Sequence, residues 1–243
     1  MTPIIELRQI RKSYGEGTSV VTEVLHGIDL CILEGELAAL TGPSGSGKST
    51  LLNLIGLLEK PSSGQLLVEG RDTAELDDAA ITALRGHRIG FIFQFHHLLP
   101  GFTALENVMM PSILDVGRPT AQGRDKALQL LDQVGLKDAA HKRPSQLSGG
   151  MQQRVAVARA LSLSPRLILA DEPTGNLDTR SANDIFELLQ SVNQSQKSAC
   201  LIVTHDPALA ARCARQIQIV DGQLLRAAPA GPLASASRAA PGT

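Results

Sequence analysis

Short apolar segments bounded by turn residues recur along the chain, and helix-like patterns lie between several of them. Segment 37–40, LAAL, is apolar at every position and leads into a glycine-rich loop, as a buried strand of a parallel sheet does. This alternation predicts an α/β fold with a mostly parallel core sheet. The expected strands cover residues 4–10, 24–33, 36–41, 65–69, 89–93, 167–171, 199–203 and 216–220.

The opening strands alternate irregularly around Gly15 and Gly17, which favours an antiparallel β subdomain laid against the main sheet. Between about residues 104 and 163 strand signals nearly vanish, and helical patterns over 121–134 and 150–162 replace them. We therefore expect a helical subdomain, over about residues 95–164, inserted in the core.

The end of the chain has a different composition. After a predicted turn at Asp221 and Gly222, it is nearly all Ala, Pro, Gly and Ser, too poor in bulky apolar groups to fold. The expected organisation is one domain over residues 1–226 and a disordered tail over 227–243.

Composition narrows the function classes. Of 243 residues, 23 are Lys or Arg and 24 are Asp or Glu, so a net charge of -1 provides no broad positive field for nucleic acid. Cys31, Cys200 and Cys213 form no CxxC pair, which favours reduced thiols over a disulfide framework or a zinc site. The start of the chain does not read as a secretion signal, and the longest apolar run, 51–58, is far too short for a membrane helix. Any membrane span is therefore expected on another chain.

Residues 42–50, GPSGSGKST, match the phosphate-loop pattern GxxxxGK[ST] between a predicted strand and a predicted helix. Its glycines let successive N–H groups turn inward around a phosphate, Lys48 would reach the outer phosphates, and Ser49 would contribute a hydroxyl to Mg²⁺. Roughly one chain of this length in a hundred would match by chance, and a dinucleotide fold would need GxGxxG. The predicted nucleotide-binding residues are Gly42, Pro43, Ser44, Gly45, Ser46, Gly47, Lys48, Ser49 and Thr50.

Two carboxylates, Asp171 and Glu172, follow the apolar strand of RLILADEPT at its carboxyl end, where sheets of this kind bind ligands. Asp171 suits Mg²⁺, and Glu172 suits the base or orienting group for an attacking water. The alternative is a loop with solvated acids, which the phosphate loop makes the weaker interpretation.

Ser148, Gly149 and Gly150 precede the helical run MQQRVAVARAL, and so place an N-cap and bare amides at a helix N-terminus. The alternative is an ordinary capped helix. One nucleotide is already held at 42–50, so this second phosphate-binding site is best used on a partner's ATP in a symmetric dimer.

The segments GPSGSGKS, LSGGMQQR, RLILADEP, NLD (176–178) and VTHD (203–206) have the order and spacing found in ABC ATPases, and the chain resembles that family over about residues 4–226. The resemblance implies a P-loop NTPase fold of the ABC type, ATP and Mg²⁺ as ligands, and a homodimer that hydrolyses ATP. It also implies that Gln94 senses Mg²⁺ and water, that Asp178 lies at the dimer seam, and that His205 touches the γ-phosphate. Tyr14 stands where the family places an aromatic on adenine, although a surface tyrosine is the alternative.

Four of five phenylalanines lie between residues 91 and 102, and apolar loop residues there indicate a partner. Segment 93–111 resembles that of lipoprotein-releasing ABC ATPases, which implies membrane permease subunits docked near Phe95–Val108 and a peripheral location on the cytoplasmic face of the inner membrane. A macrolide-exporter ATPase and a cell-division ABC ATPase remain alternatives. DNA-repair ABC ATPases fit less well, because 50–147 contains no sustained heptads or paired cysteines.

Overall fold

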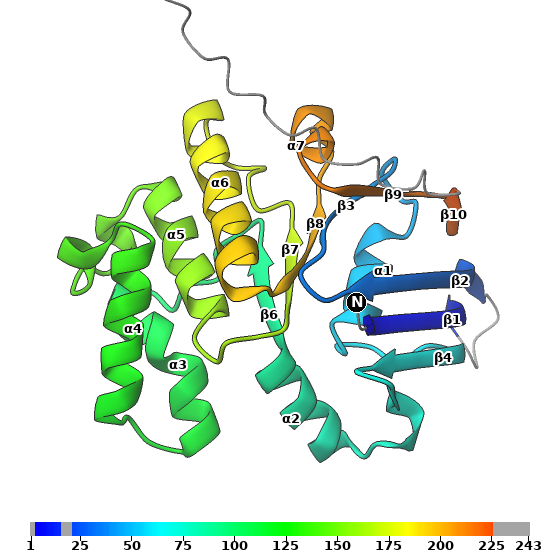
Figure 1. Ribbon diagram of the computed structural model, residues 1–243, viewed down its shortest axis with the longest axis horizontal. Coiled ribbons are helices and arrows are strands. Elements are labelled where there is room, and N and C mark those ends of the chain that lie inside the picture. The colour runs from blue at the N-terminus through cyan, green and yellow to red at the C-terminus, as the bar shows by residue number, and fades with distance from the viewer. Residues whose placement is uncertain (1–2, 16–20, 226–243) are drawn as a thin grey trace, which may run out of the picture.

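The computed structural model describes residues 3–15 and 21–225. Two sheets and a group of helices make up the molecule (Figure 1). The expected disordered tail, 227–243, lies outside the described residues. Within the described part, no helix combines the length and apolar character needed to cross a membrane.

The core sheet has the strand order β10-β9-β3-β8-β7-β6. All neighbouring pairs are parallel except β9 with β10, which confirms the mostly parallel sheet. Its strands are β3 (Leu37–Thr41), β6 (Ile89–Phe93), β7 (Leu167–Asp171), β8 (Ala199–Val203), β9 (Arg215–Val220) and β10 (Gln223–Leu225).

The second sheet is antiparallel and has the order β2-β1-β4-β5, which confirms the expected β subdomain. Its first strand extends four residues beyond the expected end at residue 10, because the exposed stretch up to Tyr14 still pairs with β2. The strands are β1 (Pro3–Tyr14), β2 (Thr22–Leu33), β4 (Ser63–Val68) and β5 (Arg71–Asp72).

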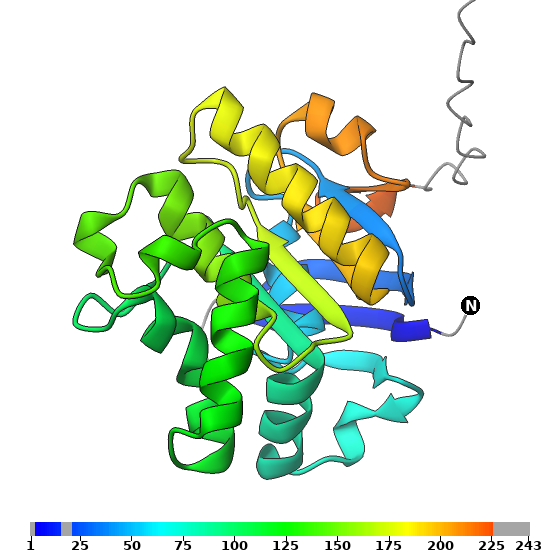
Figure 2. The ribbon, with the colours of Figure 1, turned by 60° about the vertical axis from the view of Figure 1, so that its left-hand side comes forward.

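Helices fill the connections between strands. A group of three, α3, α4 and α5, stands apart from the antiparallel sheet, as Figure 2 shows in green, and forms the helical part of the fold. The bounds of that inserted subdomain, about 95–164, stay a prediction. The α-helices are α1 (Lys48–Ile55), α2 (Asp78–Arg88), α3 (Ala104–Val116), α4 (Ala121–Gln133), α5 (Gly149–Ala160), α6 (Thr179–Gln196) and α7 (Pro207–Ala211). Short 3₁₀ turns cover Thr73–Glu75, Lys137–Ala139 and Pro144–Gln146.

The core sheet separates two hydrophobic clusters, because successive residues of a strand face opposite sides. Ile168 and Ala170 of β7 belong to the cluster that includes α3, α4 and α5. Leu167 and Leu169 belong to the cluster shared with α1 and the antiparallel sheet. Strands buried on both faces in this way hold the loops at their carboxyl ends in fixed positions.

Candidate functional site

The carboxyl ends of four neighbouring parallel strands bring several of the predicted site residues to one edge of the core sheet. In register, Phe93 of β6 pairs with Asp171 of β7, and Asp171 pairs with Val203 of β8. Val203 in turn pairs with Leu40 of β3. The phosphate loop, Gln94 and Glu172 directly follow β3, β6 and β7, Asp171 is the last residue of β7, and His205 comes two residues after β8.

The phosphate loop adopts a backbone that only glycine fits at two points. Gly42 has a φ of 152°, and a Cβ there would lie 2.1 Å from the Ile219 carbonyl oxygen. Gly47 has a φ of 100° and is the N-cap of α1, where no capping side chain accepts a hydrogen bond from the first amides of the helix. Such a loop before a helix N-terminus fits a phosphate group.

Lys48 and Ser46 complete the loop. The Lys48 ammonium donates to the carbonyl oxygens of Gly42 at 2.8 Å and Pro43 at 2.7 Å, and thus lies inside the loop. Ser46 Oγ is buried and has no hydrogen-bond partner among the described residues. Ser49 and Thr50 lie in the first turn of α1, while Ser44 and Gly45 form the exposed tip of the loop.

Asp171 and Glu172 differ in their surroundings although they are adjacent. Burial raises the pKa of the half-buried Asp171, the charge of Glu172 raises it further, and the charge of Lys48 opposes both. Glu172 has a φ of 44°, an uncommon conformation for a residue other than glycine, and its N–H donates to the Val203 carbonyl at 3.0 Å. The Glu172 side chain, on this strained backbone, points towards the carboxyl end of β8.

Glu172 and His205 meet at this end. His205 Nδ1 lies 2.9 Å from Glu172 Oε2. Both residues line a small hollow of about 230 Å³ together with Thr174, Thr204 and Asp206. The side chain of His205 is 70% exposed, which leaves its remaining ring nitrogen available to a ligand.

Gln94 is held by a residue that the sequence interpretation did not select. Gln94 Nε2 donates to Asn176 Oδ1, and Asn176 Nδ2 donates to the Gln94 carbonyl, both at 3.3 Å. Gly175 lies between the two functional groups, since a Cβ there would lie 3.0 Å from Gln94 Nε2 and 3.3 Å from Glu172 Oε2. Asn176 is the first residue of the NLD motif, so this motif could have indicated its role from the sequence.

Tyr14 lies next to α1, near Thr50, and the residue is 40% exposed. Its hydroxyl donates to Glu59 Oε2 at 2.7 Å, and Lys12 Nζ lies 5.0 Å from the ring centre. Burial, followed by the Glu59 contact, raises the pKa of Tyr14. Glu59, which the sequence interpretation also omitted, therefore holds the ring beside Thr50, the last residue of the phosphate-loop segment.

Ser148, Gly149 and Gly150 belong to a different part of the molecule. Ser148 caps α5 by accepting a bond from Met151 N–H at 3.3 Å. A Cβ on Gly150 would lie 3.2 Å from Ser181 Oγ, and Ser181 in turn bonds Asp178, the N-cap of α6. In Figure 1 strands β7 and β8 separate α5 from α1. One chain therefore does not bring Ser148 to its own phosphate loop.

The end of β6 and the loop after Gln94 are attached to α5 by two side chains that the sequence interpretation missed. Gln153 Nε2 donates to the Phe93 carbonyl at 3.3 Å, and the Arg159 guanidinium donates to the carbonyls of His96 at 2.9 Å and His97 at 2.7 Å. Burial lowers the pKa of Arg159. These bonds span about sixty residues of chain, so no local pattern in the sequence reveals them.

The predicted docking segment, Phe95–Val108, has two structurally different halves. Phe95 is 66% exposed and Phe102 is 41% exposed, so the first half can present apolar groups. Leu105 and Val108 are buried in the core, so the second half packs inside the helical part. Sequence alone did not separate these halves, because both contain apolar residues.

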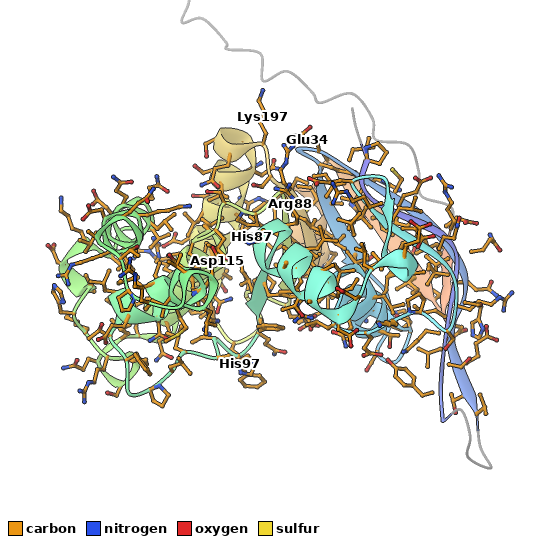
Figure 3. All side chains as sticks on the ribbon, turned by 90° about the horizontal axis from the view of Figure 1, so that it is seen from below. Glu34, His87, Arg88, His97, Asp115 and Lys197 are labelled. Carbon is orange, nitrogen blue, oxygen red and sulfur yellow. The ribbon has the colours of Figure 1, made fainter. Side chains whose placement is uncertain are left out.

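Beside this segment lies a groove of about 660 Å³ between α2 and α3. His87 of α2 and Asp115 of α3 both line it and are in contact (Figure 3), with His87 Nε2 3.1 Å from Asp115 Oδ1. His97 lies edge-on to Phe93 at 5.3 Å between ring centres, and His96 is half-buried. The histidines thus have separate environments, and no group of three metal-binding His, Cys, Asp or Glu side chains occurs in residues 3–15 and 21–225.

Comparisons with known proteins agree with this geometry. A family model described as ABC transporter matches residues 25–175. The chain is 57% identical over 224 residues, 92% of its length and 99% of the relative's, to the lipoprotein-releasing system ATP-binding protein LolD 1 of Rhodopseudomonas palustris. It is also 57% identical over 228 residues, 94% of its length and 95% of the relative's, to LolD of Anaeromyxobacter dehalogenans.

Solved structures give the same result. The ATP-binding cassette MJ0796, in a dimeric post-hydrolysis state bound to ADP and phosphate, has a TM-score of 0.84 at 40% identity and covers 93% of this chain and 99% of its own. The cbiO1 protein of Clostridium perfringens, part of a cbiONQ transporter complex, has a TM-score of 0.83 at 27% identity, covering 93% and 88%. The chain belongs to the ABC transporter family.

Proposed function

We propose that this chain is the ATP-hydrolysing subunit of a membrane system that releases lipoproteins from the inner membrane. The observation that carries the chemical part is the convergence of Lys48, Asp171, Glu172 and His205 at one edge of the sheet. A phosphate-binding loop beside a carboxylate pair is the arrangement that phosphoryl transfer to water requires.

Each side chain has a distinct task in this proposal. Lys48 exchanges its two loop carbonyls for the outer phosphates of ATP. Glu172 orients the attacking water and accepts its proton, and His205 holds Glu172 in place while its free ring nitrogen meets the γ-phosphate. Tyr14 stacks on the adenine, with its hydroxyl fixed by Glu59.

Three oxygen-bearing side chains at this edge of the sheet also fit Mg²⁺. The Ser49 hydroxyl, the Asp171 carboxylate and the Gln94 amide oxygen are hard ligands, which this ion prefers. When bound there, Mg²⁺ would neutralise charge on the phosphates. The half-buried position of Asp171 and the fixed position of Gln94 beside Asn176 support these assignments.

The active unit is a homodimer in which Ser148, Gly149 and Gly150 bind the partner's ATP. Their separation from the chain's own phosphate loop supports this arrangement, as does the dimeric state named for the MJ0796 cassette. Asp178 then lies at the seam, because its α6 N-cap adjoins the start of α5 through Ser181.

The membrane partner docks along Phe95–Phe102 and in the adjoining groove, on the cytoplasmic face of the inner membrane. Exposed apolar groups at Phe95, Leu99 and Phe102 support an interface. Lipoprotein release as the task follows from the names of the two LolD relatives and their coverage of nearly the whole chain.

Affinity purification from detergent-solubilised membranes, combined with a phosphate-release assay, tests the proposal. We expect integral proteins to co-elute and to stimulate ATP hydrolysis, and the reconstituted complex to release a lipoprotein from vesicles. Stimulation by a drug-efflux permease or by a cell-division membrane protein would replace lipoprotein release with the exporter or signalling alternative. A chain that elutes alone would overturn the membrane role.

A further inference from the structure

One face of the Tyr14 ring is covered by the ammonium group of a lysine on the same strand. Lys12 Nζ lies over the ring, 5.0 Å from its centre, which is within the range of a cation–π contact. A base stacks on the flat face of an aromatic ring, because its contact area lies there. The ammonium therefore leaves the opposite face of Tyr14 to a stacked base.

Groups other than the ring hold this ammonium in place. Lys12 Nζ donates to the Lys60 carbonyl at 2.9 Å and pairs with Glu59 Oε2 at 3.2 Å. The other carboxylate oxygen, Glu59 Oε1, accepts a bond from Asn53 Nδ2 at 2.9 Å. Asn53 belongs to α1, the helix that begins in the phosphate loop. These bonds fix Lys12 relative to that loop without help from the Tyr14 hydroxyl.

The surroundings also settle the charges of the two groups. Burial would raise the pKa of Glu59, but its bonds to neighbouring side chains, chiefly Tyr14 and Asn53, lower it. The carboxylate is therefore ionised at neutral pH. The side chain of Lys12 is 14% exposed, whereas that of Lys60 is 70% exposed. An ammonium that is largely shielded from water acts more strongly on a neighbouring ring.

A cation on one face of a phenol ring changes how the other face stacks. The faces of aromatic rings carry negative charge, and two stacked rings repel each other where these faces meet. The Lys12 ammonium draws the negative charge of Tyr14 towards itself. The opposite face, which is the one left to a base, therefore repels the π electrons of that base less.

We propose that Lys12 is a positioning residue of the nucleotide site, because it closes one face of Tyr14 and directs the adenine of ATP onto the other. The inference rests on the proposed stacking of adenine on Tyr14 and adds the residue that orients it. Lys12 acts through the ring and not on the phosphates. Its contribution is therefore confined to ligands that carry a base.

Titration calorimetry of the full chain with two ligands tests this confinement. ATP has a base, whereas inorganic triphosphate offers the phosphate loop similar anionic groups without one. Lys12→Met keeps an unbranched side chain of similar length and removes the charge. It should raise the Kd for ATP about fivefold, the size expected for a cation–π contact, and leave the Kd for triphosphate within about twofold of wild type.

Two further variants separate the charge from the fold. Lys12→Arg keeps a cation that stacks on aromatic rings and pairs with carboxylates, so its ATP affinity should be close to that of wild type. Lys60→Met is the matched control, because the Lys60 ammonium pairs with the exposed Asp78 at 2.9 Å. Such a surface pair contributes little, so the Kd for ATP should stay within about twofold of wild type.

The double variant with Tyr14→Ala shows whether the lysine acts through the ring. If it does, Lys12→Met adds nothing to the loss of ATP affinity in Tyr14→Ala. The role of Lys12 would be overturned by an equal loss for ATP and triphosphate, by a loss that persists without the ring, or by wild-type ATP affinity in Lys12→Met. Wild-type ATP affinity in Tyr14→Ala would overturn the stacking itself, and a wild-type chain that binds no ATP would overturn the proposed function.

Discussion

His205 Nδ1 lies 2.9 Å from Glu172 Oε2, so the side chains that end two neighbouring strands form one unit. Glu172 reaches this position from a left-handed backbone with a φ of 44°. The pair is partly solvated, with side-chain exposures of 25% and 70%, and therefore adds little to folding stability. Its strain and exposure are understandable if the pair serves hydrolysis.

Glu172→Gln should leave ATP binding intact and lower turnover by about 100-fold or more, because the amide keeps the shape but cannot accept a proton. His205→Ala should also lower turnover. If His205 acts through Glu172, the double variant will be no slower than Glu172→Gln alone. Phosphate release at saturating ATP measures the turnover of all three variants. If the loss in the double variant is the product of the two single losses, the two residues act independently.

Asp171→Asn should raise the melting temperature at neutral pH while abolishing hydrolysis. Burial and the charge of Glu172 raise the pKa of Asp171 in the folded chain. A carboxyl whose pKa is raised on folding destabilises the fold above that pKa, and the cost disappears as pH falls below the unfolded value of about 3.9. In thermal unfolding without nucleotide, the melting temperature of Asp171→Asn should therefore exceed that of wild type at pH 7, and the difference should shrink in acid. A melting temperature of Asp171→Asn below that of wild type at pH 7 would show that the ionised Asp171 carboxylate does not destabilise the fold.

Tyr14→Ala should weaken ATP binding by about 1–3 kcal/mol, the usual range for removal of a ring stacked on a base. Tyr14→Phe keeps the ring and loses only the bond to Glu59, so its affinity should stay close to wild type. Titration with a fluorescent ATP analogue distinguishes them. Equal ATP affinities for Tyr14→Ala and wild type would show that Tyr14 is a surface tyrosine that does not contact adenine.

Phe95→Ser should reduce co-purification with the membrane partner and leave the melting temperature and basal hydrolysis unchanged, since the ring is 66% exposed. Leu98→Ser provides the contrast. Leu98 packs against the core cluster, so its loss should cost about 1–3 kcal/mol of folding stability. A Phe95→Ser protein that is destabilised like Leu98→Ser would show that the loop only packs internally.

Sequence predicted the buried strands to the residue at 89–93, 167–171 and 199–203, because strands covered on both faces are short apolar runs with sharp ends. It missed β5 and β10, which have two and three residues and no readable period. It also left out α2, none of whose residues is buried. Pairing with a neighbouring strand, rather than local pattern, decides β5 and β10.

The family and fold expectations are confirmed, whereas the roles of the individual site residues stay predictions. Sequence motifs named the groups proposed to touch nucleotide, since the chemistry restricts residue type and spacing there. They gave no role to Asn176, although it opens the NLD motif, and they did not include Glu59 or Arg159, whose contacts with Tyr14 and His97 depend on how distant segments pack. Residues that position others are free of a local spacing rule, so they emerge only from the folded chain.

A heterodimer of two differently substituted chains tests whether each ATP site is shared between the two subunits of the dimer. In a Glu172→Gln background, a chain with Lys48→Ala is mixed with a chain with Ser148→Arg, and the ATP retained per purified heterodimer is counted. This heterodimer keeps one intact site if Ser148 serves the partner's nucleotide, whereas a chain carrying both substitutions, mixed with one carrying neither, keeps none. With shared sites, the first heterodimer should retain ATP and the second should retain none. Equal retention in the two would contradict shared sites.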